Sequence, residues 1–407
     1  MYIKRHIEQT IKKAANMFGS VLITGSRQVG KTTVLKQITK DIPYITLDDP
    51  IILDSALNET GTFFKNTPPP VFIDEIQYAP NLFPYIKMII DKEGKDGLFY
   101  LSGSQQFKMM KNISETLAGR LGILNLLGLS IREIYNINII QPFLPIKDYF
   151  DKRKTDIKKI EYNDLWKIIH KGFMPKLYAN NQVDWQMFYS SYVKTYIERD
   201  VRDLAQVGDE QKFLKFMTAV ASQTGNLLNL SSLSRDVGIS APTADRWISI
   251  LVSSNIVYLL KPYYNNITKR AVKTPKLYFL DTGLACYLTK WNTPEVLKNG
   301  AMAGAFFETF VVSEIIKSYY NNGILELPLY FYRDKDKIEI DLLIEQEGTL
   351  YPIEIKKHSD PSKADIKSFT ILDKISGIKR GEGGVICTYD NLINLKGNDK
   401  AIPIEYL

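Results

Sequence analysis

The chain of 407 residues is poor in the residues that build disulfide frameworks and soft metal sites. Its two cysteines, Cys286 and Cys387, cannot form a disulfide network and suit a reducing, cytoplasmic environment. Its three histidines, His6, His170 and His358, are too few to favour a multi-histidine metal site. Any metal is therefore expected to be a hard cation that is held by oxygen ligands.

The sequence also has no apolar run that approaches the length of a membrane span. Residues 1–13 are charged and lack the apolar core of a signal peptide. We therefore expect no membrane partner. Hydrophobic residues make up 45% of the chain, which is enough for two or three packed domains.

Charge is unevenly distributed along the sequence. Residues 1–145 carry 16 basic and 13 acidic side chains, a net charge of +3. Residues 146–300 carry 23 against 15, a net charge of +8, whereas residues 301–407 carry 13 against 17, a net charge of −4. The middle third is the natural place for a nucleic-acid surface and the last third could suit a divalent cation, although both values are also compatible with ordinary surface charge.

A complete phosphate-binding loop (Walker A) occupies residues 25–32, which read Gly-Ser-Arg-Gln-Val-Gly-Lys-Thr. A β-branched apolar run at residues 21–24 precedes it, and residues 32–39 read as a helix. This order directs backbone N–H groups and a helix N-terminus at a triphosphate, with Lys31 on the β/γ-phosphates and Thr32 on Mg²⁺. The residues expected to bind ATP are Gly25, Ser26, Arg27, Gln28, Val29, Gly30, Lys31, Thr32 and Thr33.

An apolar strand that ends in two acids follows at residues 70–75, which read Pro-Val-Phe-Ile-Asp-Glu. Such a Walker B run beside a phosphate loop supplies an aspartate for Mg²⁺ and a glutamate that polarises the attacking water. We assign these roles to Asp74 and Glu75. A buried strand with two capping acids is the structural alternative.

Two further positions fit an ATPase site. A strand at residues 98–101 ends in Ser-Gly-Ser-Gln, where a polar side chain can sense the γ-phosphate; Ser104 is the first choice and Ser102 is nearly as good. A simple Ser/Gly turn is the alternative. Arg120, after a helical stretch, could stabilise transition-state charge on the nucleotide of a neighbouring subunit, or it could be a surface arginine at a helix end.

The chain resembles the prokaryotic AAA+ ATPase family that carries a C-terminal domain of unknown function. The resemblance rests on residues 24–33, 46–50, 73–77, 101–106, 117–120, 191–200 and 276–284, and it covers nearly the whole chain. It implies ATP rather than GTP, and a helical lid that closes over the nucleotide. We expect the ATPase core at residues 1–129 and this lid at residues 130–195, beginning with a helix that Ser130 caps, with Glu133 three residues on.

Residues 196–290 are expected to form a winged helix. Helical patterns at residues 213–224, 229–238 and 243–254 precede a β-rich run at residues 256–263. Candidate DNA-binding residues are Thr243, Arg246 and Ser249 on one face of the third helix, and Lys269, Arg270 and Lys273 in the following loop. Winged helices also serve as packing or dimer modules, and Asp245 stands beside Arg246, so a structural role is the alternative.

Residues 291–407 are expected to form a nuclease-like α/β domain around a carboxylate hairpin. Residues 337–345 place Ile338, Ile340, Leu342 and Ile344 on one face, with Glu339 and Asp341 on the other. A turn centred on Glu347 and Gly348 joins them to residues 350–357 and pairs residues whose numbers sum to 695. Asp341 then lies opposite Glu354, and Glu339 lies opposite Lys356.

Glu308, Asp341 and the Glu354-x-Lys356 pair resemble, in this order, the restriction-endonuclease-like (PD-(D/E)XK) fold. The resemblance implies that Asp341 and Glu354 hold Mg²⁺ and that Lys356 polarises the attacking water, with Glu308 upstream on a helix. The sequence departs from the signature because Ile340, not proline, precedes the aspartate. A surface ion network on an inert remnant is the alternative.

The sequence thus predicts an α/β protein with a parallel-sheet P-loop core, a helical lid, a winged helix and a nuclease-like domain. Its cofactors are ATP and Mg²⁺, its expected partner is DNA, and a homo-oligomer follows if Arg120 acts across subunits. Two functions remain open. One is an ATP-regulated enzyme that cuts DNA at Asp341, Glu354 and Lys356, and the other is an ATP-controlled DNA-binding or signalling switch with an inert last domain.

Overall fold

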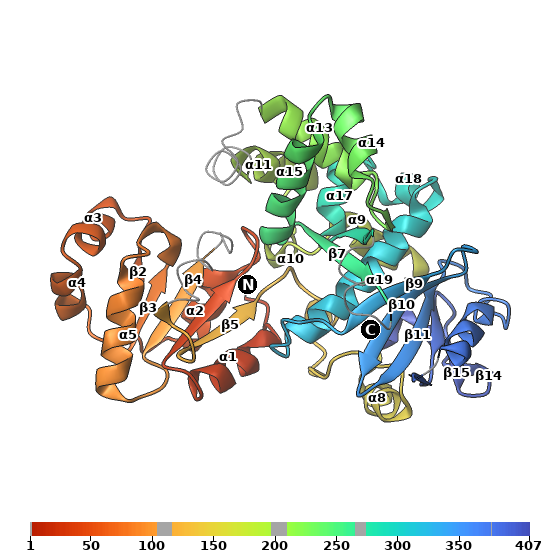
Figure 1. Ribbon diagram of the computed structural model, residues 1–407, viewed down its shortest axis with the longest axis horizontal. Helices are drawn as coiled ribbons and strands as arrows, with labels where there is room; N and C mark the ends of the chain where they lie inside the picture. The colour runs from red at the N-terminus through yellow and green to blue at the C-terminus, as the bar shows by residue number, and fades with distance from the viewer. Residues whose placement is uncertain (1, 104–115, 197–209, 265–273, 376) are drawn as a thin grey trace.

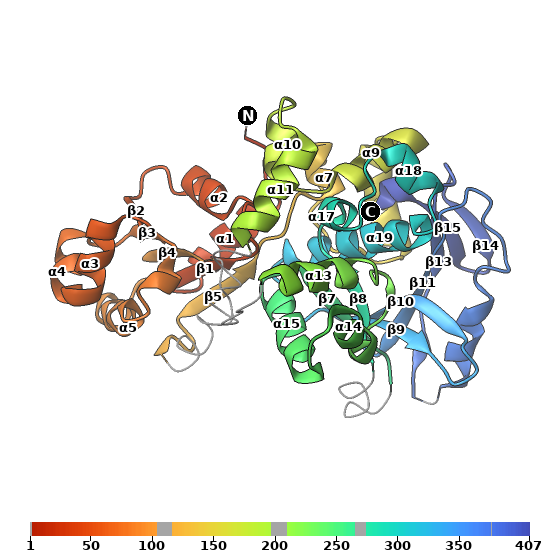
Figure 2. The ribbon, with the colours of Figure 1, turned by 90° about the horizontal axis from the view of Figure 1, so that it is seen from above.

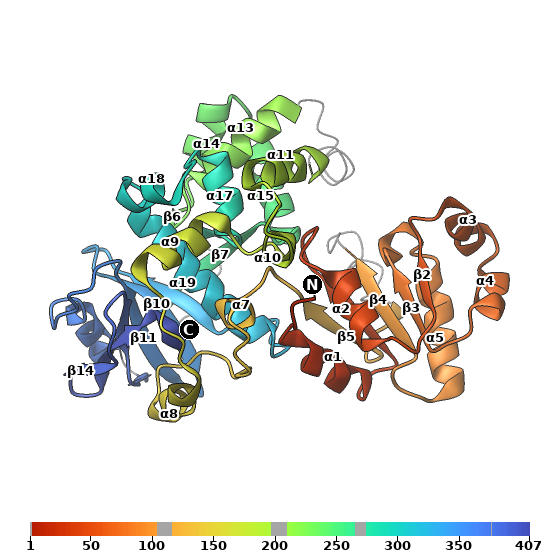
Figure 3. The ribbon, with the colours of Figure 1, turned by 180° about the vertical axis from the view of Figure 1, so that it is seen from behind.

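The computed structural model describes residues 2–103, 116–196, 210–264, 274–375 and 377–407. An N-terminal lobe, red to orange in Figure 1, lies beside a larger lobe of helices and a mixed sheet. Figure 3 shows the same two lobes from behind. A five-stranded sheet organises the first lobe and a ten-stranded sheet runs through the second, so the expected α/β class is confirmed.

The sheet of the N-terminal lobe is parallel throughout, with the strand order β2-β3-β4-β1-β5. β1 and β3 are buried along their whole length, which explains why both read as continuous apolar runs rather than as alternating patterns. The strands expected at residues 21–24, 70–75 and 98–101 are all present. The strands are β1 (Ser20–Thr24), β2 (Tyr44–Thr46), β3 (Val71–Asp74), β4 (Phe99–Gly103) and β5 (Leu121–Asn125).

Helices cover both faces of this sheet. Successive residues of a strand point to opposite faces, so Val21 and Ile23 pack in one core and Leu22 packs in another. The first core includes α1 (Ile7–Ala15) and α2 (Lys31–Ile38). The second includes residues of α3 (Pro50–Asn58), α4 (Thr60–Asn66), η1 (Ile76–Tyr78) and α5 (Leu82–Glu93).

A run of helices follows β5. The first begins with the predicted capping box, because the Ser130 hydroxyl accepts from the Glu133 N–H and the Glu133 carboxylate accepts from the Ser130 N–H. The helices of this run are α7 (Ile131–Ile134), α8 (Lys147–Arg153), η2 (Lys154–Asp156), α9 (Tyr162–Lys171), α10 (Pro175–Ala179) and α11 (Trp185–Tyr196).

These helices serve two sides of the molecule. α10 lies close to the phosphate loop, since Pro175 is 3.9 Å from a Cβ placed on Gly30, and Figure 2 shows α10 on the side of the larger lobe that faces the N-terminal lobe. The helices α8 and α9 pack instead on the C-terminal region: α9 contacts α17 and α18, and Arg153 of α8 donates to the Glu405 carbonyl. Arg132 of α7 likewise donates through Nε to the Leu407 carbonyl at 2.9 Å.

Within residues 210–264 and 274–279 the structure describes three helices and a small antiparallel sheet. α14 ends at Val237 with Gly238 as its left-handed C-cap, and α15 begins after the Ser240 cap with Pro242 in its first turn. The sheet order is β7-β8-β6, so the strand between the first two helices pairs with the last strand. The elements are α13 (Glu210–Ala221), β6 (Asn226–Leu227), α14 (Leu230–Val237), α15 (Ala241–Ser253), β7 (Val257–Pro262) and β8 (Lys276–Phe279).

The rest of the chain contains one long buried helix, α19, on which Glu308 lies as the sequence predicts. The helices of this region are α17 (Thr282–Leu288), α18 (Pro294–Asn299), α19 (Ala303–Tyr320), η4 (Lys367–Lys374) and η5 (Ile404–Tyr406). Its strands are β9 (Leu329–Arg333), β10 (Glu339–Gln346), β11 (Thr349–Ile355), β12 (Lys379–Arg380), β13 (Gly384–Cys387), β14 (Ile393–Lys396) and β15 (Asp399–Pro403).

The strands of the second lobe form one continuous sheet. Its order is β14-β15-β13-β11-β10-β9-β7-β8-β6, and β12 pairs with β11 beside this path. The junction is the parallel pairing of β7 with β9, where Lys261 lies opposite Tyr330 and Pro262 opposite Phe331. The three-helix region and the C-terminal region therefore share a backbone hydrogen-bond network.

The hairpin register is confirmed. Leu342 pairs with Ile353 and Gln346 with Thr349, so paired numbers sum to 695, and Glu347 and Gly348 form the turn with positive φ.

The predicted facing of β10 is wrong, because its pairing with β9 shifts by one residue between Ile340 and Leu343. Ile340 and Leu343 consequently share one core, while Leu342 and Ile344 belong to another. Ile338 precedes the strand and is 40% exposed rather than buried.

Candidate functional site

The phosphate loop joins β1 to α2 and depends on glycine at both ends. Gly25 has φ +149°, and a Cβ placed on it would lie 2.1 Å from the Leu126 carbonyl oxygen. Gly30 has φ +96° and caps α2 in the left-handed region. Both conformations are costly for a side-chain-bearing residue, which explains the two fixed glycines of the motif.

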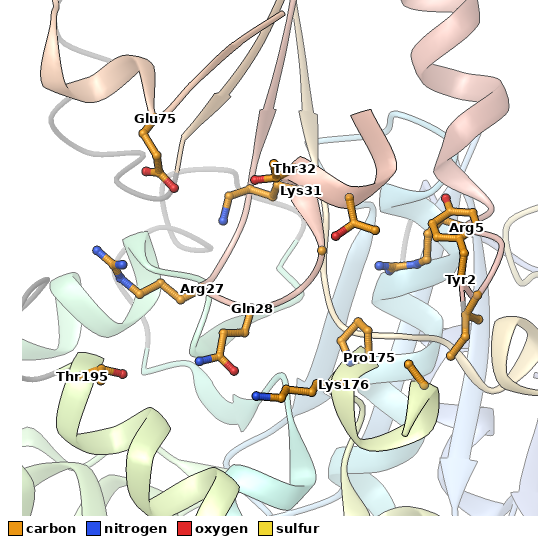
Figure 4. Close-up of a pocket in the computed structure, with 14 residues that line it drawn as sticks. Tyr2, Arg5, Arg27, Gln28, Lys31, Thr32, Glu75, Pro175, Lys176 and Thr195 are labelled. Atoms are coloured by element: carbon orange, nitrogen blue, oxygen red, sulfur yellow. The ribbon is translucent and has the colours of Figure 1, made fainter. Parts of the chain in front are cut away.

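A cavity of about 710 Å³ opens beside this loop. Figure 4 shows Arg27, Lys31 and Glu75 around one side of it, and Thr195 and Lys176 on the opposite side. Pro175, Lys176 and Ala179 come from α10 and Thr195 comes from α11, so helices of the expected lid form the far wall. The remaining lining residues are Tyr2, Ile3, Arg5, Gln28, Gly30, Thr32 and Thr33.

Lys31 is buried against the loop that carries it. Its ammonium donates to the Gly25 carbonyl at 2.9 Å and to the Ser26 carbonyl at 2.8 Å. The neighbouring Thr32 hydroxyl donates to the two carboxylate oxygens of Asp74, at 3.1 and 2.9 Å. A hydroxyl and a carboxylate in contact are the oxygen ligands that a hard cation prefers, so Thr32 and Asp74 fit Mg²⁺.

Asp74 also accepts hydrogen bonds from strands on either side of β3. Ser102 at the end of β4 donates to Oδ1, and Tyr44 of β2 donates to Oδ2 at 3.2 Å. Ser102 is therefore in contact with the candidate metal ligand, whereas Ser104 lies outside the described residues. Tyr44 is absent from the sequence prediction, since a tyrosine at a strand start carries no signal of a distant carboxylate partner.

Glu75 follows the end of β3 in a left-handed conformation, with φ 57°. Gln77 donates to its carboxylate, and the side chain lines the cavity. Burial raises the pKa of Glu75, and the nearby Lys31 ammonium partly opposes this rise. A carboxylate with a raised pKa beside a phosphate loop is suited to accept a proton from water.

Arg5, which sequence reasoning missed, holds the loop from the N-terminal segment. Its Nη1 donates to the Val29 carbonyl and its Nη2 to the Leu127 carbonyl, both at 2.8 Å. Its Nε pairs with Glu133 at 3.1 Å, and both side chains are buried. Burial alone would raise the pKa of Glu133, but Arg5 and backbone N–H donors hold it below its ordinary value.

Arg120 lies at the end of the sheet where the strands begin, whereas the phosphate loop lies at the end where they finish. It precedes β5, whose first residues pair with the start of β1, while the loop follows the end of β1. Its guanidinium contacts Asp91 and donates to the Ala118 carbonyl at 3.0 Å. Arg120 does not line the cavity of its own chain, so the predicted role remains open only across a subunit contact.

The hairpin of the C-terminal region brings three predicted residues together. The Lys356 ammonium lies 3.2 Å from Asp341 Oδ2 and 2.8 Å from Glu354 Oε2. Ser368 donates to Glu354 Oε1 at 2.8 Å, and the Ile355 N–H donates to Asp341 Oδ2 at 2.9 Å. The two buried carboxylates therefore lie together, as the register predicts, and the half-buried Lys356 bridges them.

Two partners of this network differ from prediction. Glu339 contacts Lys276 and Arg333 rather than Lys356, because the β10–β11 pairing begins only at Leu342. Lys276 of β8 is a residue that sequence reasoning missed. We call the set Lys276, Glu308, Glu339, Asp341, Glu354 and Lys356 the carboxylate cluster.

Glu308 joins the cluster from α19. It accepts from the Tyr278 hydroxyl at 2.6 Å and from Lys276 at 3.1 Å. Burial and the Asp341 charge raise the pKa of Glu308 to about 6, and the same two causes raise the pKa of Glu354 to about 8. Burial opposes ionisation of Asp341 as well, yet Lys276 and Lys356 hold its pKa below the ordinary value. The cluster is thus a compensated set of charges.

The candidate DNA-binding residues of α15 differ in exposure. Arg246 and Ser249 are exposed and Thr243 is half-buried. Thr243 and Ser249 make hydrogen bonds within their own helix, to the Ser240 hydroxyl and the Asp245 carbonyl. Lys269, Arg270 and Lys273 lie outside the described residues.

Two kinds of feature are absent from the described residues. No helix in them is both long and apolar enough to cross a bilayer. Within the same residues, no group of three or more histidine, cysteine, aspartate or glutamate side chains could hold a metal ion.

Residues 18–135 match the AAA domain family. Residues 162–295 match a domain of unknown function (DUF8612), and residues 303–407 match a second (DUF4143). Uncharacterized proteins of Mycobacterium tuberculosis and Mycobacterium bovis are each 28% identical over 360 residues, which is 88% of this chain and 75% of theirs.

Among solved structures, a Walker-type ATPase of Pyrococcus abyssi is 13% identical and has a TM-score of 0.44. The similarity covers 70% of this chain and 96% of that chain. The AAA match and the geometry of the phosphate loop together support a P-loop ATPase of the AAA type.

Proposed function

We propose that this chain binds and hydrolyses Mg-ATP and that the nucleotide controls DNA binding by its second lobe. One observation carries the proposal: Lys31 and Thr32 of the phosphate loop lie close to Asp74, which ends β3, and to Glu75, which follows it, beside a cavity that α10 and α11 wall on the far side. The site thus combines phosphate-binding groups with acids from the end of β3, a strand that β4 separates from the loop strand β1.

Each group has a distinct role in the proposed reaction. Lys31 and the loop N–H groups bind the β- and γ-phosphates, and Thr32 and Asp74 hold Mg²⁺, which supplies charge neutralisation when bound. Glu75 orients the attacking water and accepts its proton. Ser102 fixes the Asp74 carboxylate through its hydrogen bond, and Ser104 keeps the proposed role of phosphate sensor.

The region from α13 to β8 supports a winged helix. Three helices and a three-stranded sheet follow the order helix, strand, helix, helix, strand, strand, and α15 presents Arg246 and Ser249 to solvent. The basic excess of residues 146–300 favours a polyanionic partner. We propose Thr243, Arg246 and Ser249, with Lys269, Arg270 and Lys273 of the following loop, as the DNA-binding residues.

DNA cleavage by the C-terminal region is a second candidate, favoured by the contact of Lys356 with Asp341 and Glu354. It would require these carboxylates to hold Mg²⁺. In the described arrangement they do not fit a divalent cation, because ammonium groups already occupy their faces. The switch is therefore the better-supported function.

ATP turnover and nucleotide affinity in four proteins test the ATPase. We expect Lys31→Ala to weaken ATP binding at least 10-fold, because the ammonium on the phosphates is lost. Glu75→Gln should retain ATP binding and lose on the order of 100-fold in turnover, since general-base catalysis contributes this much. Lys65→Ala, an exposed lysine of α4, is the matched control and should resemble wild type. Wild-type turnover in Lys31→Ala would refute the proposal.

DNA affinity measured at several salt concentrations, with and without a non-hydrolysable ATP analogue, tests the switch. We expect the analogue to change the affinity and Arg246→Ala to weaken it across sequences, because phosphate contacts carry no base information. Asp245→Asn is the control, since it removes the neighbouring acid and should not weaken binding. Affinity that is insensitive to nucleotide and to salt would count against this part of the proposal.

A further inference from the structure

The most unusual group of the carboxylate cluster is the Lys276 ammonium. Lys276 begins β8, lies opposite Leu260 and Leu227 in the sheet, and is 3% exposed. A lysine ammonium is rarely buried to this extent unless acids surround it. Three carboxylates do so here.

The three acids converge on Lys276 from two elements. Its Nζ lies 2.5 Å from Glu339 Oε1, 3.1 Å from Glu308 Oε1 and 3.8 Å from Asp341 Oδ1. Glu308 belongs to α19, and the other two belong to β10. The ammonium therefore sits where oxygens of a helix and a strand meet, and a hard cation would be drawn to the same place.

Two further cations, besides Lys276, neutralise the carboxylates of the cluster. Arg333 pairs with Glu339 at 2.9 Å, and Lys356 pairs with Asp341 and Glu354 at 3.2 and 2.8 Å. Every carboxylate of the cluster thus has a cationic partner among the described residues. A divalent ion bound to Asp341 would stand within a few ångströms of two ammonium groups, and this repulsion is strong in a poorly hydrated interior.

We propose that Lys276 is the resident cation of the carboxylate cluster and excludes a divalent metal from Asp341 and Glu308. This proposal rests on the second candidate function, DNA cleavage. It states that the Lys276 ammonium occupies the position that the metal ion of such a nuclease would take. The hairpin can then take Mg²⁺ or Mn²⁺ only after the Lys276 side chain withdraws. Lys276 stands on β8, whereas the acids that surround it stand on α19 and β10, so a displacement of β8 relative to these two elements would withdraw the ammonium.

Binding of Mn²⁺ without nucleotide, followed by the paramagnetic resonance of the free ion, tests the proposal. The proteins are wild type, Asp341→Asn, Lys276→Met, Lys276→Arg and the double variant Lys276→Met/Asp341→Asn. Subtracting the Asp341→Asn curve isolates this site from any Mn²⁺ at Thr32 and Asp74. Lys276→Arg keeps the positive charge, whereas Lys276→Met keeps the length of the side chain without it.

We expect wild type and Lys276→Arg to show no Asp341-dependent Mn²⁺ site. Lys276→Met should gain one, at least 10-fold tighter than any binding by wild type at this position, and the double variant should lose it. ATP turnover should be the same in Lys276→Met and wild type. Failure of the proposed ATPase would appear in that assay alone, since the Mn²⁺ measurement contains no nucleotide.

Two results would overturn the proposal. One is a Mn²⁺ ion bound to wild type and lost in Asp341→Asn, because the site would then be open despite Lys276. The other is a folded Lys276→Met protein, with wild-type circular dichroism, that gains no ion. If Lys276→Met does not fold, Mn²⁺ binding by wild type is compared with that by Asp341→Asn and by Glu308→Gln. An ion that wild type binds and either variant loses would then overturn the proposal.

Discussion

The side-chain amides of Asn125 and Asn255 donate to each other across the two lobes. Asn125 Nδ2 lies 3.1 Å from Asn255 Oδ1, and Asn255 Nδ2 lies 3.2 Å from Asn125 Oδ1. Asn125 ends β5 and also accepts from the hydroxyl of Thr24, the last residue before the phosphate loop. A buried hydrogen-bond path therefore joins the loop strand to the turn between α15 and β7.

Removing one amide of this pair should destabilise the junction. In Asn125→Ala the buried Asn255 amide loses its partner, and a loss of about 1–3 kcal/mol is expected in urea unfolding. Asn255→Gly is the companion variant, because Asn255 has φ 54° and glycine preserves that conformation. If the double variant costs as much as the two single variants added together, the two amides do not act as a pair.

The Arg5 guanidinium should be needed to hold the phosphate loop in the conformation that binds ATP. Arg5→Lys keeps the charge but cannot reach Glu133, Val29 and Leu127 at once, so ATP affinity should fall about 10-fold. Lys12→Ala, which changes an exposed lysine of α1, is the control and should leave the affinity for ATP unchanged. Isothermal titration with ATP measures both, and equal affinities in Arg5→Lys and wild type would contradict the role given to the Arg5 guanidinium.

The contact at Gly25 predicts a severe effect of one methyl group. A Cβ in Gly25→Ala would lie 2.1 Å from the Leu126 carbonyl oxygen, so the loop must move and ATP binding should be lost. Gly94→Ala is matched, since its φ is also positive but no atom lies within 4 Å of the new Cβ. It should cost about 1–2 kcal/mol of stability and retain ATP binding. Retention of ATP binding in both variants would show that the loop tolerates the shift.

Substitutions of Arg120 and of its partner Asp91 distinguish a catalytic role of Arg120 from that of a surface ion pair. Both side chains are partly exposed, so breaking the pair should cost at most about 1 kcal/mol. If Arg120 acts on a neighbouring nucleotide, Arg120→Ala should lower turnover at least 10-fold at high protein concentration, while Asp91→Asn should not. Steady-state turnover over a range of protein concentrations measures this, and equal rates in the two variants would leave Arg120 only a surface role.

His170 should make the protein less stable in acid. Burial lowers the pKa of His170, while its Nε2 bond to the Trp291 carbonyl at 2.9 Å opposes this. The neutral ring is favoured in the folded state, so its stabilisation is present above the unfolded pKa of about 6.5 and is lost as pH falls through the lower folded pKa.

Glutamine can keep a donor near the Trp291 carbonyl without titrating. Between pH 8 and pH 5 wild type should therefore lose more stability than His170→Gln, because only the histidine takes up a proton more readily in the unfolded state. Glu295, the nearby acid that raises this pKa, is unchanged in the comparison. If stability falls equally with pH in the two proteins, the His170 ring has the same pKa in the folded and the unfolded protein, and the prediction is wrong.

Local patterns predicted much of the site. The phosphate loop, the acids at the end of β3, the Ser130 capping box and the hairpin register each depend on residues a few positions apart. Turn geometry fixes such a register without help from the rest of the chain.

Other features could not be predicted in this way. The bulge between Ile340 and Leu343 reverses the facing of β10 through an extra residue opposite β9, and simple alternation cannot anticipate it. Lys276 reads as an ordinary surface cation, because its acidic partners lie 32 to 65 positions further along the chain. Arg5 meets Glu133 across 128 positions for the same reason.

The pairing of β7 with β9 has a practical consequence for anyone who divides this protein. A cut near residue 290 follows the boundary that the sequence suggests, yet it would sever the sheet between Lys261 and Tyr330. Each fragment would then present a bare strand edge with unmet N–H and C=O groups, which invites self-association. Fragments that span β6 to β15 without interruption should stay monodisperse where the separated halves precipitate.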